Sequence, residues 1–483
     1  MRAALDLLFD ATGEAYSHPA LAERGTTLGY SSLLCLGNRT ITGMLSTCGQ
    51  QFVDWSAAYR LFERERIDPA VFFTVARSTA LSFLQPEEPV VAFLDDTLIG
   101  KTGRKVTGAS WRRDPLGPPF QTNLVWSQRF LQCSLALRQN ATIAPGPARA
   151  IPIAFTHTPT PKKPRSNASD QEKAAYRQLS KQTRLSAVGN AQIHTLRAQL
   201  NADPAHSGRS LLIGVDGSFT NATVLKHLPE RTTVIGRIRK DCSLCRLPDQ
   251  DASASRGRTR QYGERLPTPE QMRQDATIPW ITVQAWAAGT LHDFRIKSIG
   301  PVRWRSAGGK QNLRLIIIEP LAYRPRKGAR LLYRKPTYLI CTDPELDLST
   351  LLQAYLWRWE IEVNFREEKS LLGVGQPQVR TPETVERVPA FQVALYSFLL
   401  LAERLVEKPL EHLPQPLWRR QQPDTDKNEC RRSTGDLIRH LRAEIWGKGI
   451  GVENFSGFAI HHHGASKPEK FEKCLASAVF YAS

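Results

Sequence analysis

The first 87 residues carry apolar side chains at helical spacing. Residues such as Trp55 and Ala58 recur every three or four positions, which is typical of one face of a helix. We therefore predict a helical N-terminal domain at residues 1–87. Two segments in it, beginning near Thr40 and near Asp54, are compatible with a helix-turn-helix, which would make it a DNA-binding domain, and equally with ordinary helical packing.

Two short apolar runs that end in acids predict buried strands. Residues 90–94 are all apolar and lead into Asp95 and Asp96, and a second run, 211–215, leads into Asp216. Runs this short and this apolar are typical of central strands buried on both faces. Further strands are expected at 120–126, 130–137 and 150–155, followed by an exposed basic loop at 156–167 and one long polar helix at 169–200. The alternation predicts an α/β fold.

The second half of the chain changes pattern twice. β-forming residues cluster between Gly-, Pro- and Arg-rich turns up to Cys341, and helical periodicity then runs from Leu348 to about Glu407. We predict five parts: the helical domain 1–87, a first core part 88–220, a β-rich insertion 221–345, a helical second core part 346–410 and a C-terminal tail 411–483.

The predicted tail contains a Pro-rich linker and one amphipathic helix. The linker is Leu413–Pro416, and the helix is Asp436–Trp446, which Ser433 can cap. The apolar stripe of this helix favours docking on another surface, so we expect a contact with DNA or with a second subunit.

Charge directs attention to polyanions. The 483 residues include 65 Lys and Arg against 46 Asp and Glu, a formal net charge of +19 with a pI near 9.8. Because the basic residues are spread along the chain rather than gathered beside an apolar helix, nucleic acid is favoured over a membrane surface. Eight scattered cysteines indicate a reducing compartment, and we find no signal peptide and no run of about 18 apolar residues, so a cytoplasmic protein is expected.

The segment from Tyr355 to Lys369 carries a polar stripe. Tyr355, Glu362 and Lys369 are seven residues apart, and Arg358 precedes Glu362 by one turn, so one face of a helix presents all four. A solvent-facing row of ion pairs is the plain alternative. The same helix also bears Trp357 and other bulky residues, which favours an enclosed stripe and therefore a site.

This spacing, Tyr355, Arg358, Glu362 and Lys369, resembles the Tyr-Arg-Glu-Lys signature of DDE-type transposases of bacterial insertion sequences, in the superfamily of insertion sequence family four. The resemblance extends to a first Asp before Thr, as in Asp96-Thr97, and to a second Asp before Gly and an aromatic residue, as after Asp216. It covers about residues 88–405. It implies an α/β, ribonuclease H-like catalytic core interrupted by a β-rich insertion, with a helical N-terminal domain and a helical C-terminal tail.

The resemblance also implies a reaction. Asp96, Asp216 and Glu362 would hold two Mg²⁺ ions, for which Mn²⁺ substitutes, while Arg358, Lys369 and Tyr355 would bind DNA phosphates. The partners would be double-stranded inverted-repeat ends and target DNA, bound by a homodimer. No nucleotide cofactor is expected, because no Gly-rich loop ending in Lys-Ser/Thr is present. The expected activity is strand cleavage followed by joining of 3′-hydroxyl ends to target DNA.

The first acid is ambiguous, because consecutive strand residues face opposite sides and only one of Asp95 and Asp96 can reach the metal. We predict Asp96, because it precedes Thr97 as in the family. Two alternatives to the transposase remain open: a nuclease of the same fold that only hydrolyses DNA, and a DNA-binding protein that has lost catalysis.

Weaker candidates are assigned structural roles. Lys101 and Arg104 are expected to be solvated rather than catalytic. Cys242 and Cys245 lack a second pair at zinc-site spacing, so we interpret them as structural thiols. His461–His463 is interpreted as a polar tail. Trp304 is a candidate for stacking on a displaced base, with Trp280 and Trp286 as competitors and core packing favoured for all three.

Overall fold

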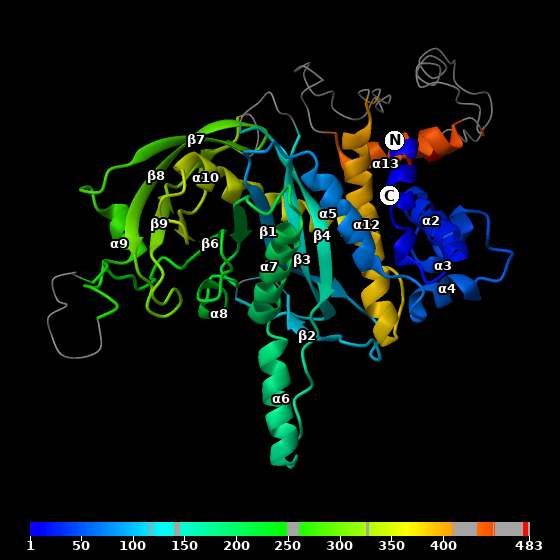
Figure 1. Cartoon of the computed structure of the whole chain (residues 1–483), viewed down its shortest axis with the longest axis horizontal. Coiled ribbons are helices and arrows are strands. Elements are labelled where there is room, and N and C mark those ends of the chain that lie inside the picture. Colours follow the sequence, from blue (N-terminus) through cyan, green and yellow to red (C-terminus); the bar gives the residue numbers. More distant parts are fainter. Residues whose placement is uncertain are drawn as a thin grey trace.

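A mixed sheet runs through the middle of the molecule, with helices on both of its faces (Figure 1). The computed structural model describes residues 1–114, 117–118, 120–139, 145–248, 260–324, 328–407, 410, 432–447, 449 and 477–481. Among these residues the main sheet has ten strands, and a second sheet has two. The α/β class predicted from the sequence is confirmed.

One half of the main sheet contains both acid-bearing strands. Its strands are β1 (Val90–Gly100), β2 (Ser110–Arg113), β3 (Leu124–Arg138), β4 (Ala148–His157), β5 (Leu211–Val215) and β6 (Thr232–Arg237). β3 runs antiparallel to β1 on one side and to β2 and β4 on the other, whereas β5 and then β6 follow parallel to β1. The two strands expected at 120–126 and 130–137 are therefore one continuous strand, β3.

The predicted β-rich insertion continues the same sheet. Its strands are β7 (Ile281–Ala287), β8 (Thr290–Val302), β9 (Leu313–Ile318) and β12 (Thr337–Cys341), with β10 (Ala322–Tyr323) and β11 (Leu332–Tyr333) forming the small sheet. β12 pairs antiparallel with β6, and β9, β8 and β7 follow outward. The insertion thus extends the core edge that begins at β6, on the left of Figure 1.

Alternation along β1 defines two cores. Val90, Ala92 and Leu94 point into the larger core, whereas Val91 and Phe93 point into a second one. Helices on the larger-core side are α5 (Pro69–Leu81), α7 (Leu185–Ala202) and α12 (Pro382–Leu405), and those on the other are α10 (Leu348–Trp357) and α11 (Trp359–Ser370). Val91 and Phe93 therefore face α10 and α11, and Asp95, the next odd-numbered residue, lies on their side of β1.

The N-terminal region is helical, as predicted, and packs on the buried helix α12. Its elements are α1 (Arg2–Asp10), η1 (Gly13–Ala15), α2 (Pro19–Leu34), α3 (Ile41–Thr47), α4 (Ser56–Glu63) and α5. α12 is long and apolar enough to cross a membrane, but 89% of its apolar window is buried inside the fold, which is compatible with a soluble protein. Its apolar character is explained by its central position in the core.

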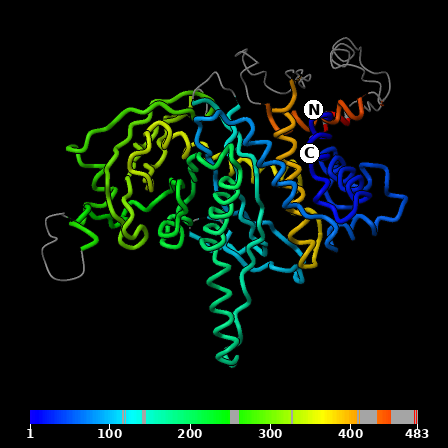
Figure 2. The backbone as a smooth tube through the Cα atoms, viewed as in Figure 1, coloured from blue at the N-terminus to red at the C-terminus, as the bar shows by residue number. Residues whose placement is uncertain are grey.

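The C-terminal helix docks within its own chain. α13 (Thr434–Trp446) buries Leu437 and Leu441, and the guanidinium of Arg442 donates to the backbone oxygens of Leu34 and Cys35 at the end of α2. Figure 2 shows the two ends of the chain side by side. The apolar stripe predicted to meet DNA or a second subunit is therefore used inside the chain. The predicted Pro-rich linker lies outside the described residues, and the short α15 (Ser477–Phe480) follows α13.

The remaining short helices are α8 (Ala222–Leu225) and α9 (Pro269–Gln274). The single helix expected at 169–200 is two helices, α6 (Asp170–Gln182) and α7, which meet at Thr183 and Arg184. α6 begins with a capping box in which the side chains of Ser169 and Glu172 each satisfy the other's backbone N–H. This local cap fixes the helix start without help from the rest of the protein.

Candidate active site

The strand register brings two acids together. Leu94 of β1 pairs with Val215 of β5 in a parallel ladder, so the next residues, Asp95 and Asp216, are neighbours at the carboxyl edge of the sheet. Asp216 directly follows the last residue of β5, and its charge is close enough to Asp95 to raise the pKa of that carboxyl. The face of β1 that bears Asp95 is covered by α10 and α11, and α11 carries Glu362. The fold thus brings the three acids Asp95, Asp216 and Glu362 to one side of the sheet.

The first acid of this group is Asp95 rather than the predicted Asp96. Arg358 joins it to the signature helix: one Nη donates to Oδ2 of Asp95 at 3.1 Å and the other to Oε1 of Glu362 at 2.8 Å. Alternation along β1 points Asp96 to the opposite face; its cationic neighbours are Arg129 and Arg112, and the charge of Asp216 also acts on it. The choice of Asp96 followed the family's Asp-Thr pair, whereas strand alternation and register together decide the direction of each side chain.

The acids at this edge are incompletely neutralised. Burial, followed by the nearby negative charge of Asp216, raises the pKa of Asp95 to about 7, although the Arg358 guanidinium acts in the opposite direction. The side chain of Asp95 is 16% exposed and that of Arg358 is 12% exposed. Burial also raises the pKa of Asp96, with Arg129 opposing it. More negative charge is gathered here than Arg358 offsets, so the edge favours an added cation.

The signature residues face this edge from a helix that is interrupted at Arg358. α10 ends at Trp357 and α11 begins at Trp359, so the stripe is shared between two helices instead of lying on one. The ring of Tyr355 lies 5.9 Å from the guanidinium carbon of Arg358. Lys369 donates from Nζ to Oγ1 of Thr97 at 2.6 Å. Thr97 lies on the same face of β1 as Asp95, so all four signature residues are on the acid side.

Helix α11 is held in place by polar contacts with its neighbours. Asn364 donates from Nδ2 to the backbone oxygen of Ala150 on β4 at 2.9 Å. Oε2 of Glu367 accepts from the hydroxyls of Tyr396 on α12 and Thr434 on α13, each at 2.6 Å. Because these groups are buried or half-buried, their hydrogen bonds fix the rotation of α11 and hence the direction of Glu362.

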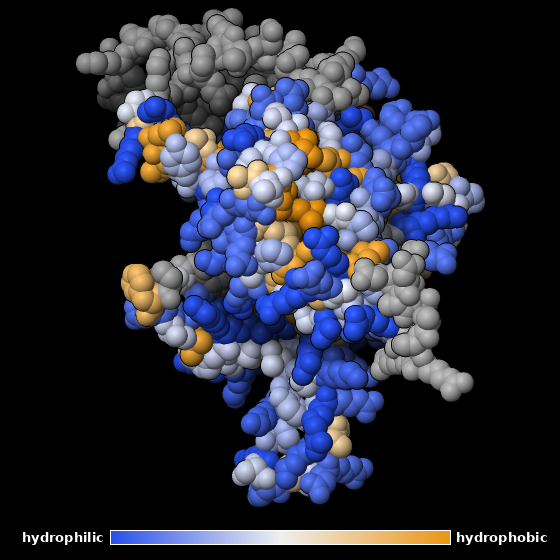
Figure 3. All heavy atoms as spheres, turned by 90° about the vertical axis from the view of Figure 1, so that its left-hand side faces the viewer, coloured by the Kyte–Doolittle hydropathy of each residue, from blue (hydrophilic) through white to orange (hydrophobic). Residues whose placement is uncertain are grey.

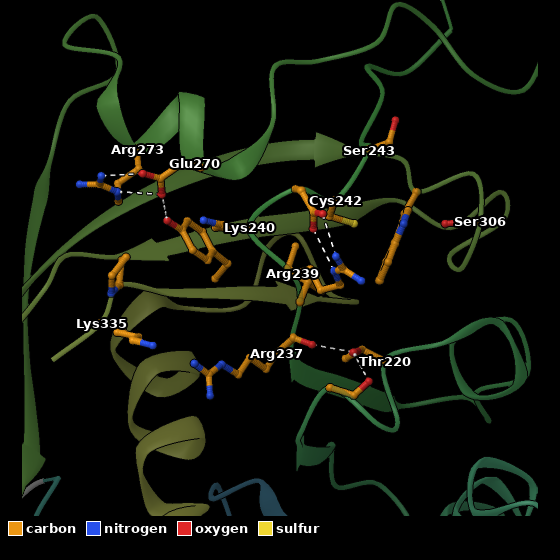
Figure 4. A pocket seen from close by; sticks show the side chains of 16 residues that line it. Thr220, Arg237, Arg239, Lys240, Cys242, Ser243, Glu270, Arg273, Ser306 and Lys335 are labelled. Atoms are coloured by element: carbon orange, nitrogen blue, oxygen red, sulfur yellow. Dashed lines mark hydrogen bonds and ion pairs between the residues drawn. The ribbon is translucent and has the colours of Figure 1, made fainter. Parts of the chain in front are cut away.

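A basic cavity lies beyond the second acid (Figure 4). Its volume is about 1100 Å³, and Gly217, next to Asp216, forms part of its wall. The cavity is lined by five cations: Arg237, Arg239, Lys240, Arg273 and Lys335. Asp241 neutralises Arg239, and Glu270 neutralises Arg273. The other three cations form no ion pair with any described residue, so the cavity wall is positively charged close to the edge of the sheet that carries Asp95 and Asp216, the acid edge.

Sequence reasoning missed Arg237, although its position carried a signal. Arg237 ends β6, the next strand parallel to β5, and the carboxyl ends of parallel strands share one edge of a sheet. The same rule that selected the acids therefore points to Arg237. The other missed residue is Lys335, which precedes β12; nothing in its local sequence indicates that it lines the cavity.

The weaker candidates have structural surroundings. Lys101 is buried and donates to the backbone oxygens of Gly375 and Pro377, so it ties β1 to the loop after α11 rather than being solvated as predicted. Arg104 covers the ring of Trp111 at 4.9 Å. Cys242 and Cys245 are buried free thiols; burial raises the pKa of Cys242 to about 12.

The three candidate tryptophans have different environments. Trp280 packs under Nζ of Lys297 at 4.7 Å, and the backbone N–H of Trp286 donates to Gln353. Trp304 packs against two of the hydrophobic cores and also lines the basic cavity. His461–His463 lies outside the described residues.

The residues at the acid edge fit a hard divalent cation by their chemistry. Carboxylate oxygens are the ligands that Mg²⁺ prefers, and Asp95, Asp216 and Glu362 supply them from one side of the sheet. In the described part of the chain, no group of three or more His, Cys, Asp or Glu side chains is gathered tightly enough to hold a metal ion. The Arg358 guanidinium lies between Asp95 and Glu362 and donates to both carboxylates.

Comparison with known proteins adds no relative. No family model matches the chain, and no curated protein is significantly similar to it.

Proposed function

We propose that this protein is a DNA transposase that cleaves the inverted-repeat ends of its element and joins their 3′-hydroxyl ends to target DNA. The observation that carries the proposal is the register of β1 and β5, which puts Asp95 beside Asp216 on the face covered by the Glu362 helix. Three carboxylates from two strands and a helix, with Arg358 and Lys369 on the same side, suit phosphoryl transfer on a polyanion.

The strand order supports a ribonuclease H-like core. The order β4-β3-β1-β5-β6 is an antiparallel meander followed by two strands parallel to β1, and its acids lie on adjacent central strands. The β-rich segment between β6 and α10 lies where the resemblance expects an insertion. In this proposal the insertion contributes the basic wall beside the site.

In the proposed site Asp95, Asp216 and Glu362 would hold two Mg²⁺ ions, for which Mn²⁺ would substitute, and the metals would supply charge stabilisation for an in-line displacement. Lys369 and Arg358 bind DNA phosphates, and Tyr355 stacks against Arg358 to hold it on the acid side. Thr97 orients the ammonium group of Lys369. Arg358 bridges the two acids and keeps them on a common side until the cation binds.

The proposed partners follow from charge. A chain with a net charge of +19 attracts the DNA backbone without regard to sequence, and beside the second acid lie Arg237, Lys240 and Lys335, which form no ion pair with a described residue. Two ends must be cut and joined together, so we propose a homodimer on DNA. We place the protein in the cytoplasm, with no nucleotide cofactor.

The test is strand cleavage and joining on labelled DNA that carries the repeats flanking the gene, with Mg²⁺. We expect the intact protein to cut and join, and Glu362→Ala to bind the same DNA and do neither. Glu383→Ala, which removes an exposed carboxylate from the first turn of α12, is the matched control and is expected to retain both activities.

Two results would change the proposal. Cleavage without any joined product supports the rival, a nuclease of the same fold. Equal behaviour of the intact protein and Glu362→Ala means that Glu362 holds no metal, and it leaves a DNA-binding protein without catalysis.

A further inference from the structure

A helical arm projects from the acid edge of the sheet. α6 has 13 residues, and none of them is buried. It continues roughly the line of α7 beyond the body of the molecule (Figure 1), and Figure 3 shows the projection as mostly hydrophilic. A helix of this length extends about 20 Å at 1.5 Å per residue. Because α6 contributes no buried residue to the core, core packing does not account for its position.

The root of the arm is anchored to both acid-bearing strands. Gly189 of α7 approaches Phe219, three residues after Asp216, so closely that a Cβ there would lie 2.5 Å from the ring; it would lie 3.2 Å from Leu94, the residue before Asp95. Farther along α7, Ile193 and Leu196 are fully buried. The helix from which the arm extends is therefore fixed in position relative to the acids.

The arm and the loop that leads to it are strongly basic. Residues 158–184 contain seven Lys and Arg and two acids, a net charge of +5 over 27 residues. Lys173, Arg177 and Lys181 are four residues apart and form one stripe along α6. None of the seven cations forms an ion pair with a residue that the structure describes. A stripe of uncompensated cations on a stiff support complements a row of phosphates.

We infer that this arm binds the phosphate backbone of the DNA duplex whose scissile strand lies at the acid edge. The inference rests on the proposed function, because it takes DNA as the substrate held there. At 3.4 Å per base pair, 20 Å of helix covers about six base pairs beyond the site. Phosphate contacts fix position and orientation without reading bases, so the arm holds the duplex in line with the acids whatever its sequence.

The test compares two variants of the full chain that change the net charge equally. Lys173→Gln/Arg177→Gln/Lys181→Gln removes three charges from the basic stripe, and Gln171→Glu/Gln178→Glu/Gln182→Glu adds three negative charges on another face of the same helix. Binding of a fluorescein-labelled, random-sequence duplex is measured by anisotropy over a range of salt concentrations. Thermal unfolding checks that both variants stay folded, which is expected because α6 buries no residue.

We expect the stripe variant to bind more weakly and its plot of log affinity against log salt to be shallower by about 2 to 3, since each lost phosphate contact removes about 0.9 from the slope. The control variant should keep most of the original slope. Equal slopes for the two variants would overturn the arm's role in DNA binding. Unchanged DNA binding with a lost dimer in sedimentation would also overturn it and would assign the arm to a second copy of the chain.

Failure of the arm and failure of the proposed function give different results. If the intact protein cuts and joins DNA but the stripe variant binds it as the intact protein does, only the inference about the arm fails. If the intact protein neither binds nor cuts DNA, the proposed function fails and the inference fails with it.

Discussion

Strands β1 and β5 look alike in sequence but present their acids differently. Each is a run of five apolar residues that leads into an acid. β5 ends at Val215, and Asp216 opens a turn in which the backbone N–H and the hydroxyl of Ser218 donate to its carboxylate. β1 instead continues to Gly100, so its two acids are strand residues that point to opposite faces.

The difference shows what an acid at a strand end and an acid inside a strand each require. Asp216 is oriented by its own turn, so local sequence specifies its surroundings. Asp95 is oriented by pairing with a strand about 120 residues later and by Arg358, which lies on a distant helix. An acid inside a strand can therefore be assigned only when register is known. Burial makes Asp95 costly to ionise.

The largest expected effect is on the rate of DNA cleavage, and it distinguishes Asp95 from Asp96, the two acids of β1. Asp95→Asn and Asp216→Asn should each lower the rate of DNA cleavage about a thousand-fold or more, equivalent to about 4 kcal/mol of transition-state stabilisation. Asp96→Asn should stay within about tenfold of the intact protein, because its side chain lies on the other face. Single-turnover cleavage with saturating protein measures all three. An inactive Asp96→Asn beside an active Asp95→Asn would reverse the assignment.

The next effect concerns the stability of the metal-free protein. Because burial and Asp216 raise the pKa of Asp95 to about 7 from an ordinary 3.8, the folded state loses stability as the pH rises through this window. Asp95→Asn lacks this loss, so its stability relative to the intact protein should increase from pH 4 to pH 8, by up to about 4 kcal/mol. Urea unfolding in chelator at several pH values measures the change.

The double variant Asp95→Asn/Asp216→Asn tests whether the two acids interact. Asp216→Asn removes one cause of the raised pKa of Asp95, so adding Asp95→Asn to it should increase stability less than adding Asp95→Asn to the intact protein. Equal gains in the two backgrounds would mean that the two acids do not interact, and that β1 and β5 carry independent sites.

The smallest effect concerns the packing that joins the two strands to α7. Gly189→Ala should lower the free energy of unfolding by about 1–3 kcal/mol, because its Cβ would overlap the ring of Phe219. Helix propensity alone predicts the opposite sign, a gain of about 0.5–1 kcal/mol. Gly208→Ala is the control, since nothing lies within 4 Å of the added carbon. A stabilised Gly189→Ala protein would show that α7 is not tightly fixed to the acid strands.

Local patterns predicted much of the fold. The apolar runs of β1 and β5, the helical N-terminal region, the return to strands before Cys341 and the helix Asp436–Trp446 were all found by periodicity, because burial on one or two faces leaves a mark in the sequence. The continuous β3 was divided in two, because a polar stretch between apolar runs does not reveal that a strand pairs with different neighbours along its length.

The site was predicted less completely than the fold. Spacing selected the four signature residues, and all four face the acid edge. The interruption of the helix at Arg358, between α10 and α11, depends on tertiary packing, and the spacing of the residues does not indicate it. The choice between Asp95 and Asp96 depends on pairing between strands that are far apart in the chain. The basic cavity joins residues from β6, α9 and the start of β12, which no local pattern connects.

The guanidinium of Arg442 has a consequence for biosynthesis. It supplies the donors for the last backbone oxygens of α2, which no longer have partners within their own helix, and about 400 residues of chain separate the two. During translation α2 therefore leaves the ribosome long before Arg442, which caps it, has been synthesised. In a chain that stops before Arg442, the end of α2 stays exposed to water or to chaperones. We expect such truncated chains to be degraded.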